Sequence, residues 1–193
     1  MKIGIFGGSF NPPHNMHKNI ALDLIKKGYA DKIIYVPTGD TYQKKELIEF
    51  EYRYNMVKII TKNYDNLSVS NISNDNNYKY TYQTLDYFQN IYKNDIIYFI
   101  CGTDNLKEFD TWKEYKYILE KYKLLIIKRN NDDIDNILNK YKEHKNNVII
   151  TNVIPNGISS TYIRSNIETN DIKQYLDDKV YDYIKKFNLY KDN

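Results

Sequence analysis

The sequence predicts an α/β fold: a doubly wound, mainly parallel sheet with helices on both faces, in one domain that spans residues 1–193. Three observations lead to this prediction. Short apolar runs of strand length, rich in Ile, Val, Tyr and Phe, recur along the chain. Longer segments with helical spacing separate them, and this alternation favours parallel strands joined by crossover helices. The length of 193 residues and the hydrophobic fraction of 41% suit one ordinary core.

The expected elements follow one another in a regular order. Strands are expected at 2–6, 32–36, 67–70, 95–101, 123–127 and 147–151. Helices are expected at 14–27, 47–62, 81–92, 112–121 and 131–142. In the first helix, Ile20 and Leu24 lie four residues apart and form part of an apolar stripe. Ligands of such sheets bind beyond the carboxyl ends of the strands, so the loops after the strands are expected to carry the chemistry.

Composition narrows the class of protein. The net charge is only +3 and the lysines are scattered, so no nucleic-acid partner is expected. No apolar run approaches the roughly 20 residues of a membrane span, and the N-terminus reaches glycines too early for a signal peptide. We therefore expect a cytoplasmic protein without membrane contact. The one cysteine, Cys101, excludes an internal disulfide, and a homo-oligomer is compatible with the sequence.

The stretch "GGSFNPPHNMH" (7–17) follows the first expected strand. Its glycines permit a tight turn and a close approach of the backbone to a ligand, and Pro12 and Pro13 suit the first turn of a helix. His14 and His17 are three residues apart, so on a helix both imidazoles face the same way, beside unpaired N–H groups that attract an anion. This predicts a phosphate site. The alternative is a plain strand-to-helix turn with two surface histidines.

Two other kinds of site are disfavoured at this loop. Two histidines lack a third metal ligand, since His144 lies in the separate polar run "KEHKNN", so we expect no protein metal site. The nucleotide-loop pattern GxxxxGK[ST] is absent, and the glycines at 4, 7 and 8 do not fit GxGxxG.

A second anion signal follows the last expected strand. Ser159, Ser160 and Thr161 stand at a helix start, and Arg164 comes one turn later. Hydroxyls, free N–H groups and a guanidinium together suit an anion. The alternative is an ordinary capping sequence, because Ser and Thr are favoured caps.

Weaker signals fall on two more loops at the same edge of the sheet. Lys44 and Lys45 follow the second strand, as flexible cations for a polyphosphate or as solvated side chains. Asp104 follows the fourth strand and could accept from ribose hydroxyls. Trp112, the only tryptophan, could stack on a flat ring, although packing is the commoner role of a lone tryptophan. Because all of these residues fall on one edge of the sheet, each supports the functional interpretation of the others.

Four ordered motifs resemble the [HT]xxH nucleotidyltransferases, and within them the nicotinamide and nicotinate mononucleotide adenylyltransferases. The motifs are "GSFNP" with a later His, "GDTYQKKEL" followed by Arg53 and Met56, "CGTDNLKEF" followed by Trp112, and "ISSTYIR". The resemblance runs over nearly the full chain and implies a Rossmann-like fold. "FNP", "NMH" and "GDTYQKK" are similar to the eukaryotic-type form, whereas His14 and residues 79–85 are similar to the bacterial form. The sequence departs from the bacterial pattern HxGH at Met16, which stands where that pattern has glycine.

The resemblance implies roles for individual residues. The catalytic residues are expected to be His14, His17, Lys44 and Arg164. The ATP-binding residues are expected to be Gly8, Ser9, Phe10, Gly102, Asp104, Ser159, Ser160 and Thr161. The acceptor is expected to meet Lys45, Tyr80, Thr81 and Trp112, the last by stacking on a pyridine ring.

The implied reaction transfers AMP from ATP to a pyridine mononucleotide, giving NAD or its deamidated precursor and pyrophosphate, with Mg²⁺ carried by ATP. No arginine lies near Trp112 or in 79–85 to read a carboxylate, so both nicotinate and nicotinamide mononucleotides are expected to be accepted. Two alternatives stay open. One is a sister transferase that acts on phosphopantetheine or another small phosphorylated acceptor, and the other is a nucleotide- or RNA-binding protein without turnover.

Overall fold

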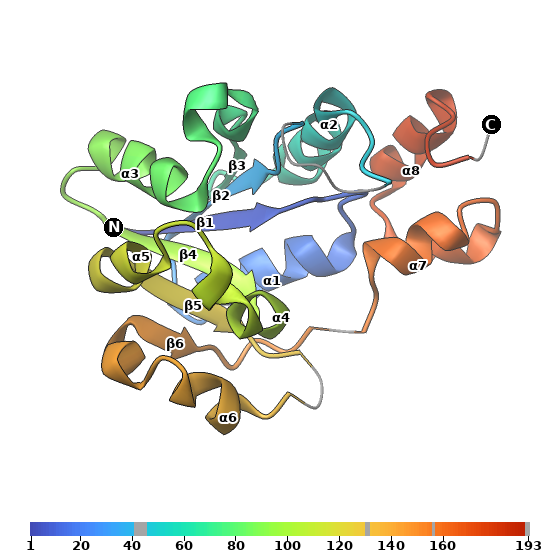
Figure 1. Ribbon diagram of the computed structural model, residues 1–193. Helices are drawn as coiled ribbons and strands as arrows, with labels where there is room; N and C mark the ends of the chain where they lie inside the picture. Colours follow the sequence, from blue (N-terminus) through green and yellow to red (C-terminus); the bar gives the residue numbers. More distant parts are fainter. Residues whose placement is uncertain (41–45, 130–131, 156, 192–193) are drawn as a thin grey trace.

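The computed structural model describes residues 1–40, 46–129, 132–155 and 157–191, and a six-stranded sheet forms its centre (Figure 1). The strands are β1 (Lys2–Gly8), β2 (Lys32–Pro37), β3 (Leu67–Val69), β4 (Ile96–Gly102), β5 (Lys123–Ile127) and β6 (Val148–Ile150). Their order in the sheet is β3-β2-β1-β4-β5-β6, and every neighbouring pair is parallel. All six expected strands are confirmed, as is the doubly wound α/β fold.

Most of the helices lie between successive strands, and the last two α-helices follow β6. The α-helices are α1 (Asn15–Lys26), α2 (Phe50–Thr61), α3 (Thr81–Ile91), α4 (Thr103–Lys107), α5 (Tyr115–Lys121), α6 (Ile134–Asn139), α7 (Ser160–Ser165) and α8 (Asp178–Lys186). Short 3-10 helices are η1 (Ile72–Asn74), η2 (Asn76–Tyr78), η3 (Phe109–Thr111), η4 (Lys142–Asn147) and η5 (Asn170–Tyr175). The expected helix at 131–142 is shorter than predicted, because the chain turns into η4 from Lys142.

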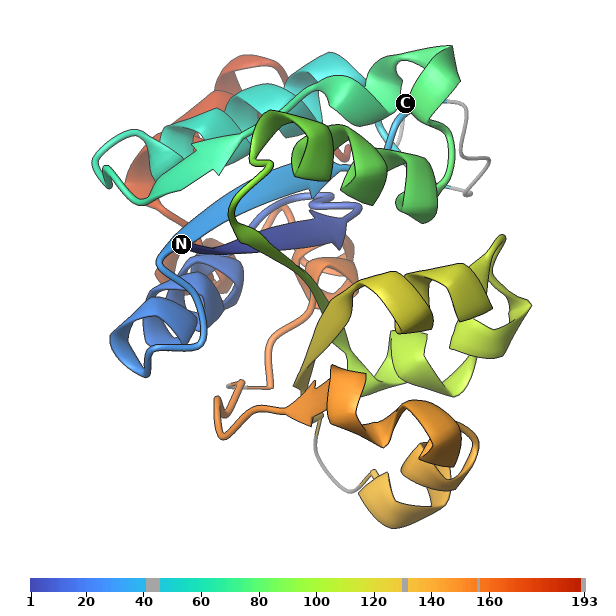
Figure 2. The same cartoon turned by 90° about the vertical axis from the view of Figure 1, so that its left-hand side faces the viewer.

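Alternate residues of each strand face opposite layers, because strand side chains alternate between the two faces. Ile3 and Ile5 pack in a core with α3, α4 and α5, whereas Ile33 and Tyr35 pack in a second core with α1. Figure 2 shows α1 and α3 on opposite sides of β1 and β2. Both faces of the sheet are therefore covered, which explains the nearly continuous apolar strands.

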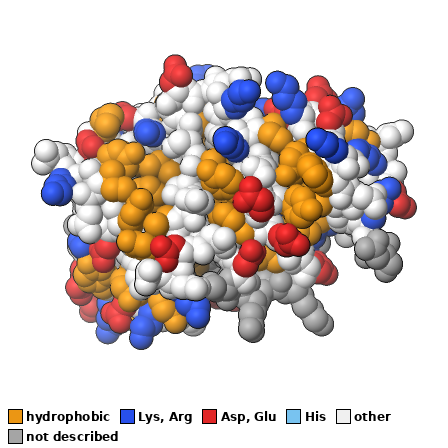
Figure 3. Space-filling model, turned by 90° about the horizontal axis from the view of Figure 1, so that it is seen from above, with side chains coloured by type: hydrophobic (Ala, Val, Ile, Leu, Met, Phe, Trp, Pro, Cys, Tyr) orange, Lys and Arg blue, Asp and Glu red, His pale blue; other side chains and the backbone are white. Residues whose placement is uncertain are grey.

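A third core lies beyond the edge of the sheet. Met56 and Ile60 of α2 pack there against apolar residues of α7, η5 and α8, such as Ile163 and Ile184. Figure 1 shows α7 and α8 on the side to which the arrowhead of β1 points. The face seen in Figure 3 mixes apolar side chains with both signs of charge and shows no basic stripe.

The strand order reverses its direction between β1 and β4. The chain proceeds from β1 outward to β2 and β3, and then returns to β4 on the other side of β1. A crevice for ligands forms outside the carboxyl ends of the strands at such a point. The fold therefore directs attention to the turns after β1 and β4.

Candidate functional site

The turn after β1 differs from the expected glycine turn. The residue with positive φ is Phe10, at 46°, whereas Gly7 and Gly8 still belong to the strand. A Cβ at Gly7 would lie 3.2 Å from the Phe99 ring, and one at Gly8 would lie 3.0 Å from the Phe10 ring. The glycines therefore make room for aromatic rings, and they do not supply the left-handed conformation.

The two histidines lie together, but not as two members of one helical turn. Helix α1 begins at Asn15, and His14 is its N-cap in an extended conformation with φ −138° and ψ 172°. The helix expected at 14–27 is confirmed, but Pro12 and Pro13 precede it, so the prediction that they lie in its first turn was wrong. His17 is nevertheless folded back against His14, with ring centroids 3.8 Å apart. The expected pairing of the imidazoles is confirmed in this different geometry.

A backbone hydrogen bond sets the protonation of His17. The N–H of His14 donates to Nδ1 of His17 over 3.2 Å. Burial, then the neighbouring His14 and Arg129, hold the pKa of His17 well below its ordinary value, so the ring is neutral at neutral pH. A neutral imidazole whose Nδ1 accepts must carry its proton on Nε2. His17 thus has a fixed N–H donor on the side away from the helix start.

His14 is the more buried of the pair. Its relative exposure is 1%, whereas His17 is half-buried, so His17 has the more accessible ring edge. Burial, helped by the charge of Arg129, lowers the pKa of His14 to about 4. Within the described residues, Nδ1 of His14 has no hydrogen-bond partner. Both rings are therefore neutral groups that donate hydrogen bonds and carry no positive charge.

The end of β4 places Asp104 beside an arginine that the sequence reading missed. A Cβ at Gly102 would lie 2.3 Å from a carboxylate oxygen of Asp104, so a larger residue there would make that carboxylate move from its present position. Nε of Arg129, which follows β5, lies 3.4 Å from the same Asp104 oxygen. The available signal was the position of Arg129 directly after a buried strand at the ligand-bearing edge.

Helix α7 is tied to the turn after β1. Ser159 caps the helix by accepting from the N–H of Tyr162, as the capping alternative predicts. The hydroxyl of Ser160 donates to the carbonyl of Pro12 over 2.8 Å. Nη1 of Arg164 donates to the carbonyl of Asn11 over 2.9 Å.

The other guanidinium nitrogen of Arg164 donates to the Glu46 carboxylate over 2.7 Å. Thr161, beside these residues, is exposed. The structure thus brings the first and last motifs together, although they are about 150 residues apart in sequence. The roles of Ser159, Ser160, Thr161 and Arg164 toward a nucleotide stay predictions.

The expected acceptor residues lie farther along the same edge. Trp112 is half-buried, with its ring centroid 5.0 Å from that of Phe109 and 5.8 Å from that of Phe99. Tyr80 is the N-cap of α3 and is 45% exposed, and Thr81 begins that helix. Lys44 and Lys45 lie outside the described residues. Trp112 therefore has a packing role, and its stacking role stays a prediction.

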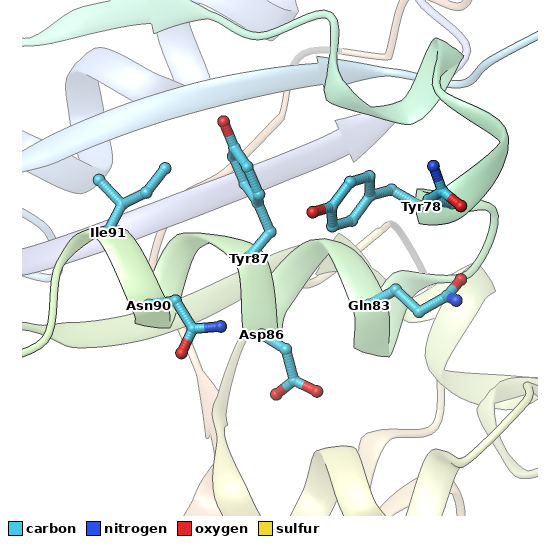
Figure 4. Close-up of a pocket in the computed structure, with 7 residues that line it drawn as sticks. Tyr78, Gln83, Asp86, Tyr87, Asn90 and Ile91 are labelled. Carbon is cyan, nitrogen blue, oxygen red and sulfur yellow. The ribbon is translucent and has the colours of Figure 1, made fainter.

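A separate surface groove lies along α3. It measures about 450 Å³ and is lined by Asn77, Tyr78, Gln83, Asp86, Tyr87, Asn90 and Ile91 (Figure 4). The carboxylate of Asp86 points away from Tyr78 and Tyr87 in this view, and it accepts hydrogen bonds from Tyr117 and Lys121 of α5. Its charge is therefore engaged in joining two helices, and the groove is not part of the site at the turn after β1.

No group of three or more His, Cys, Asp or Glu side chains that could hold a metal occurs in the part of the chain that the structure describes. Among the residues at 1–40, 46–129, 132–155 and 157–191, no helix is long and apolar enough to cross a bilayer.

Comparison with known proteins places this geometry in a family. The family model described as "Cytidylyltransferase-like" matches residues 5–166. A Clostridium tetani protein named "Probable nicotinate-nucleotide adenylyltransferase" is 36% identical over 198 residues, which cover 98% of this chain and 99% of that protein. The chain belongs to the nicotinate-nucleotide adenylyltransferases of the cytidylyltransferase-like family. The family resemblance of the four motifs is thereby confirmed.

Solved adenylyltransferases share the whole fold. The nicotinic acid mononucleotide adenylyltransferase of Plasmodium falciparum complexed with NaAD has a TM-score of 0.82 and 26% identity, and the alignment covers 100% of this chain and 98% of that one. The same protein complexed with APC gives a TM-score of 0.81 at the same identity and coverage. In this adenylyltransferase family member, the residues at the turn after β1 are therefore the first to consider for catalysis.

Proposed function

We propose that this protein transfers AMP from ATP to nicotinate mononucleotide, forming deamido-NAD and releasing pyrophosphate, as a step of NAD biosynthesis. The observation that carries the proposal is the paired neutral histidines at the β1 turn, with the Nε2 donor of His17 fixed by the backbone. The names of the relatives support the acceptor: the Clostridium tetani protein is named for nicotinate nucleotide, and the Plasmodium falciparum enzyme is complexed with NaAD.

The reaction requires no protein nucleophile. The 5′-phosphate of the acceptor is already an anion at neutral pH, so catalysis depends on placing it in line with the α-phosphorus of ATP and on stabilising the charge that develops there. In the proposed arrangement His17 donates from Nε2 to the α-phosphate, and His14 holds the ring of His17 from behind. A neutral donor of this kind needs no proton exchange during the reaction.

The other groups at the edge bind the two substrates. Asp104 accepts from ribose hydroxyls, which releases Arg129 toward the phosphates. The hydroxyls of Ser160 and Thr161, together with Arg164 and the backbone at 8–10, hold ATP. Lys44 or Lys45 assists at the phosphates. Trp112 stacks on the pyridine ring, with Tyr80 and Thr81 beside it.

Mg²⁺ is expected to arrive with ATP. A hard cation of this kind is often held by substrate phosphates with few protein ligands. The cation would neutralise charge on the phosphates. A cytoplasmic location and self-association into a homo-oligomer are further proposals, testable by fractionation and by sedimentation.

Pyrophosphate release tests the proposed reaction. Purified protein is given ATP with nicotinate mononucleotide, nicotinamide mononucleotide or phosphopantetheine, and the dinucleotide product is identified by mass. Formation of deamido-NAD supports the proposal. Release with phosphopantetheine alone would instead favour the sister transferase, and binding of RNA without release would favour the non-catalytic alternative.

A further inference from the structure

Arg53 of α2 is buried below the turns after β1 and β2. Its side chain has no exposed area, although it carries a charge. Nη1 donates both to the carbonyl of Ser9 over 3.1 Å and to the carbonyl of Thr38 over 2.6 Å. Nε donates to the carbonyl of Ile48 over 2.8 Å. One guanidinium therefore joins three segments that the sequence separates.

The buried charge has a partner at its outer end. Nη2 of Arg53 donates to the carboxylate of Asp40 over 3.2 Å, and Asp40 is about half exposed. Four of the five N–H groups of the guanidinium are thus used. Burial lowers the pKa of Arg53, and the neighbouring Asp40 raises it. A buried charge with so many directed bonds holds its partners at fixed positions, as a fork-shaped donor set allows.

The bond to Ser9 controls the conformation of the next residue. A peptide group is planar, so holding the carbonyl of Ser9 also fixes the plane that contains the N–H of Phe10. The φ angle of Phe10 is the rotation about its N–Cα bond, measured from that peptide plane. Its value of 46° is unusual for a residue with a bulky side chain. Arg53 therefore acts on the residue whose backbone conformation most needs support.

Phe10 in turn contacts the ring of His17. The two ring centroids are 5.1 Å apart with an interplanar angle of 74°, so the edge of one ring meets the face of the other. Phe10 is 2% exposed and also packs on Tyr35, whose hydroxyl donates to the carbonyl of His17 over 3.0 Å. A change in the Phe10 backbone would therefore move the imidazole as well.

We propose that Arg53 is a positioning residue for catalysis, which acts through Ser9 and Phe10 to hold the imidazole of His17 in its reactive orientation. This inference rests on the proposed function. It assigns Arg53 no contact with ATP or with the acceptor. Its effect is therefore expected chiefly in kcat, through the donor of His17, with a smaller effect on the KM for ATP, because the backbone at 8–10 is also proposed to hold ATP, and none on the KM for the mononucleotide.

A double-mutant cycle separates this role from simple support of the fold. Arg53→Met keeps much of the volume and removes all four hydrogen bonds, and it is expected to lower kcat about 10²-fold, the cost of a misplacement of about 1 Å. The KM for the mononucleotide is expected to change less than about threefold, and the KM for ATP by a smaller factor than kcat. In the His17→Ala background, Arg53→Met should change kcat by less than about threefold, because the group it positions is already gone.

Matched variants complete the design. Lys58→Met removes one charge from the exposed side of the same helix and should leave kcat and KM unchanged. Nη1 of Arg53 donates to the carbonyls of both Ser9 and Thr38. Arg53→Lys keeps a cation for these two carbonyls, so this variant should have a higher kcat than Arg53→Met. If Arg53→Met does not fold, as judged by circular dichroism, the same cycle is performed with Arg53→Lys.

The position of the imidazole can also be read without turnover. The ¹⁵N resonances of His17 in the wild-type protein should show a neutral ring with the proton on Nε2, and Arg53→Lys should weaken that preference. An equal loss of kcat from the Arg53 substitution in both backgrounds would overturn the inference, as would a KM change with constant kcat. An inactive wild-type protein with intact His17 resonances would instead count against the proposed function.

Discussion

Replacing His17 by Ala is the most direct test of the candidate site. The substitution removes the Nε2–H donor of His17. The N–H of His14 occupies Nδ1 of the same ring and thereby keeps the proton on Nε2. Loss of a single preorganised donor typically lowers kcat about 10²–10³-fold, which corresponds to about 2.7–4 kcal/mol of transition-state stabilisation. We expect a loss of that size at saturating ATP and nicotinate mononucleotide.

The stability cost of this change must be measured alongside. The ring of His17 is half-buried against Phe10, so its removal is expected to lower the free energy of unfolding by about 1–3 kcal/mol. Assays well below the unfolding midpoint separate the two effects. His144→Ala is the matched control, because His144 lies in η4, away from the β1 turn, and should keep normal turnover.

The pH dependence gives a second reading of the same group. The pKa of His17 lies well below its ordinary value, chiefly because of burial, so its ring stays neutral as the pH falls from 8 to 6. The kcat of the wild-type protein is therefore expected to show no histidine ionisation in this range. Near-normal turnover of folded His17→Ala, or a kcat step near pH 6.5 that disappears in it, would refute the reasoning.

Three further predictions follow from other parts of the site. Arg164→Ala should raise the KM for ATP more than the KM for the mononucleotide, because Arg164 is proposed to hold ATP together with the β1 turn that it bonds. Equal increases of the two KM values in steady-state assays would contradict this. His14 has a folded-state pKa of about 4 against 6.5 unfolded, so its share of the stability present above pH 6.5 should fall by about 3 kcal/mol by pH 4 in denaturant titrations. His14→Gln should remove that share and leave the part that comes from His17, whose pKa is also lowered. Trp112→Ala should weaken nicotinate and nicotinamide mononucleotides alike while ATP binding, measured by calorimetry, is unchanged; a several-thousand-fold preference of the wild-type enzyme for one acceptor would reveal a reader of the ring substituent.

The strands could be predicted because each is a short apolar run between polar segments. Parallel strands buried on both faces have this pattern, so all six were found within about two residues of their observed ends. Helix α4 was not predicted, because its five residues are too few to show a period of 3.6. Its N-cap is Gly102, which offers no capping side chain that could mark the helix start in the sequence.

The chemistry of the site was harder to predict than its location. The loops at the strand ends were identified from sequence, but the pairing of Arg129 with Asp104 joins residues 25 positions apart and depends on β4 lying beside β5. Arg53 did leave a signal. It continues the apolar stripe of Met56, Val57 and Ile60 at spacings of three, four and seven residues. A charged residue on such a stripe indicates a buried polar network.

The arginines around the site have different tasks, because some hold its turns in place and one can turn toward a ligand. Arg53 and Arg164 each donate to backbone carbonyls and to one carboxylate, Asp40 and Glu46 respectively, and so hold the loops after β1 and β2. The histidines are neutral, whereas Arg129 is charged, about half exposed, and 3.4 Å from its partner Asp104, so it is a cation that can turn toward a phosphate. Binding of ribose hydroxyls to Asp104 would release Arg129 at the moment a nucleotide arrives. Asp104→Asn should therefore weaken ribose recognition. It should also strengthen the binding of inorganic triphosphate, because Arg129 is then free of its carboxylate partner before any nucleotide arrives. If calorimetry shows that triphosphate binds Asp104→Asn no better than the wild type, Arg129 does not change partners in this way.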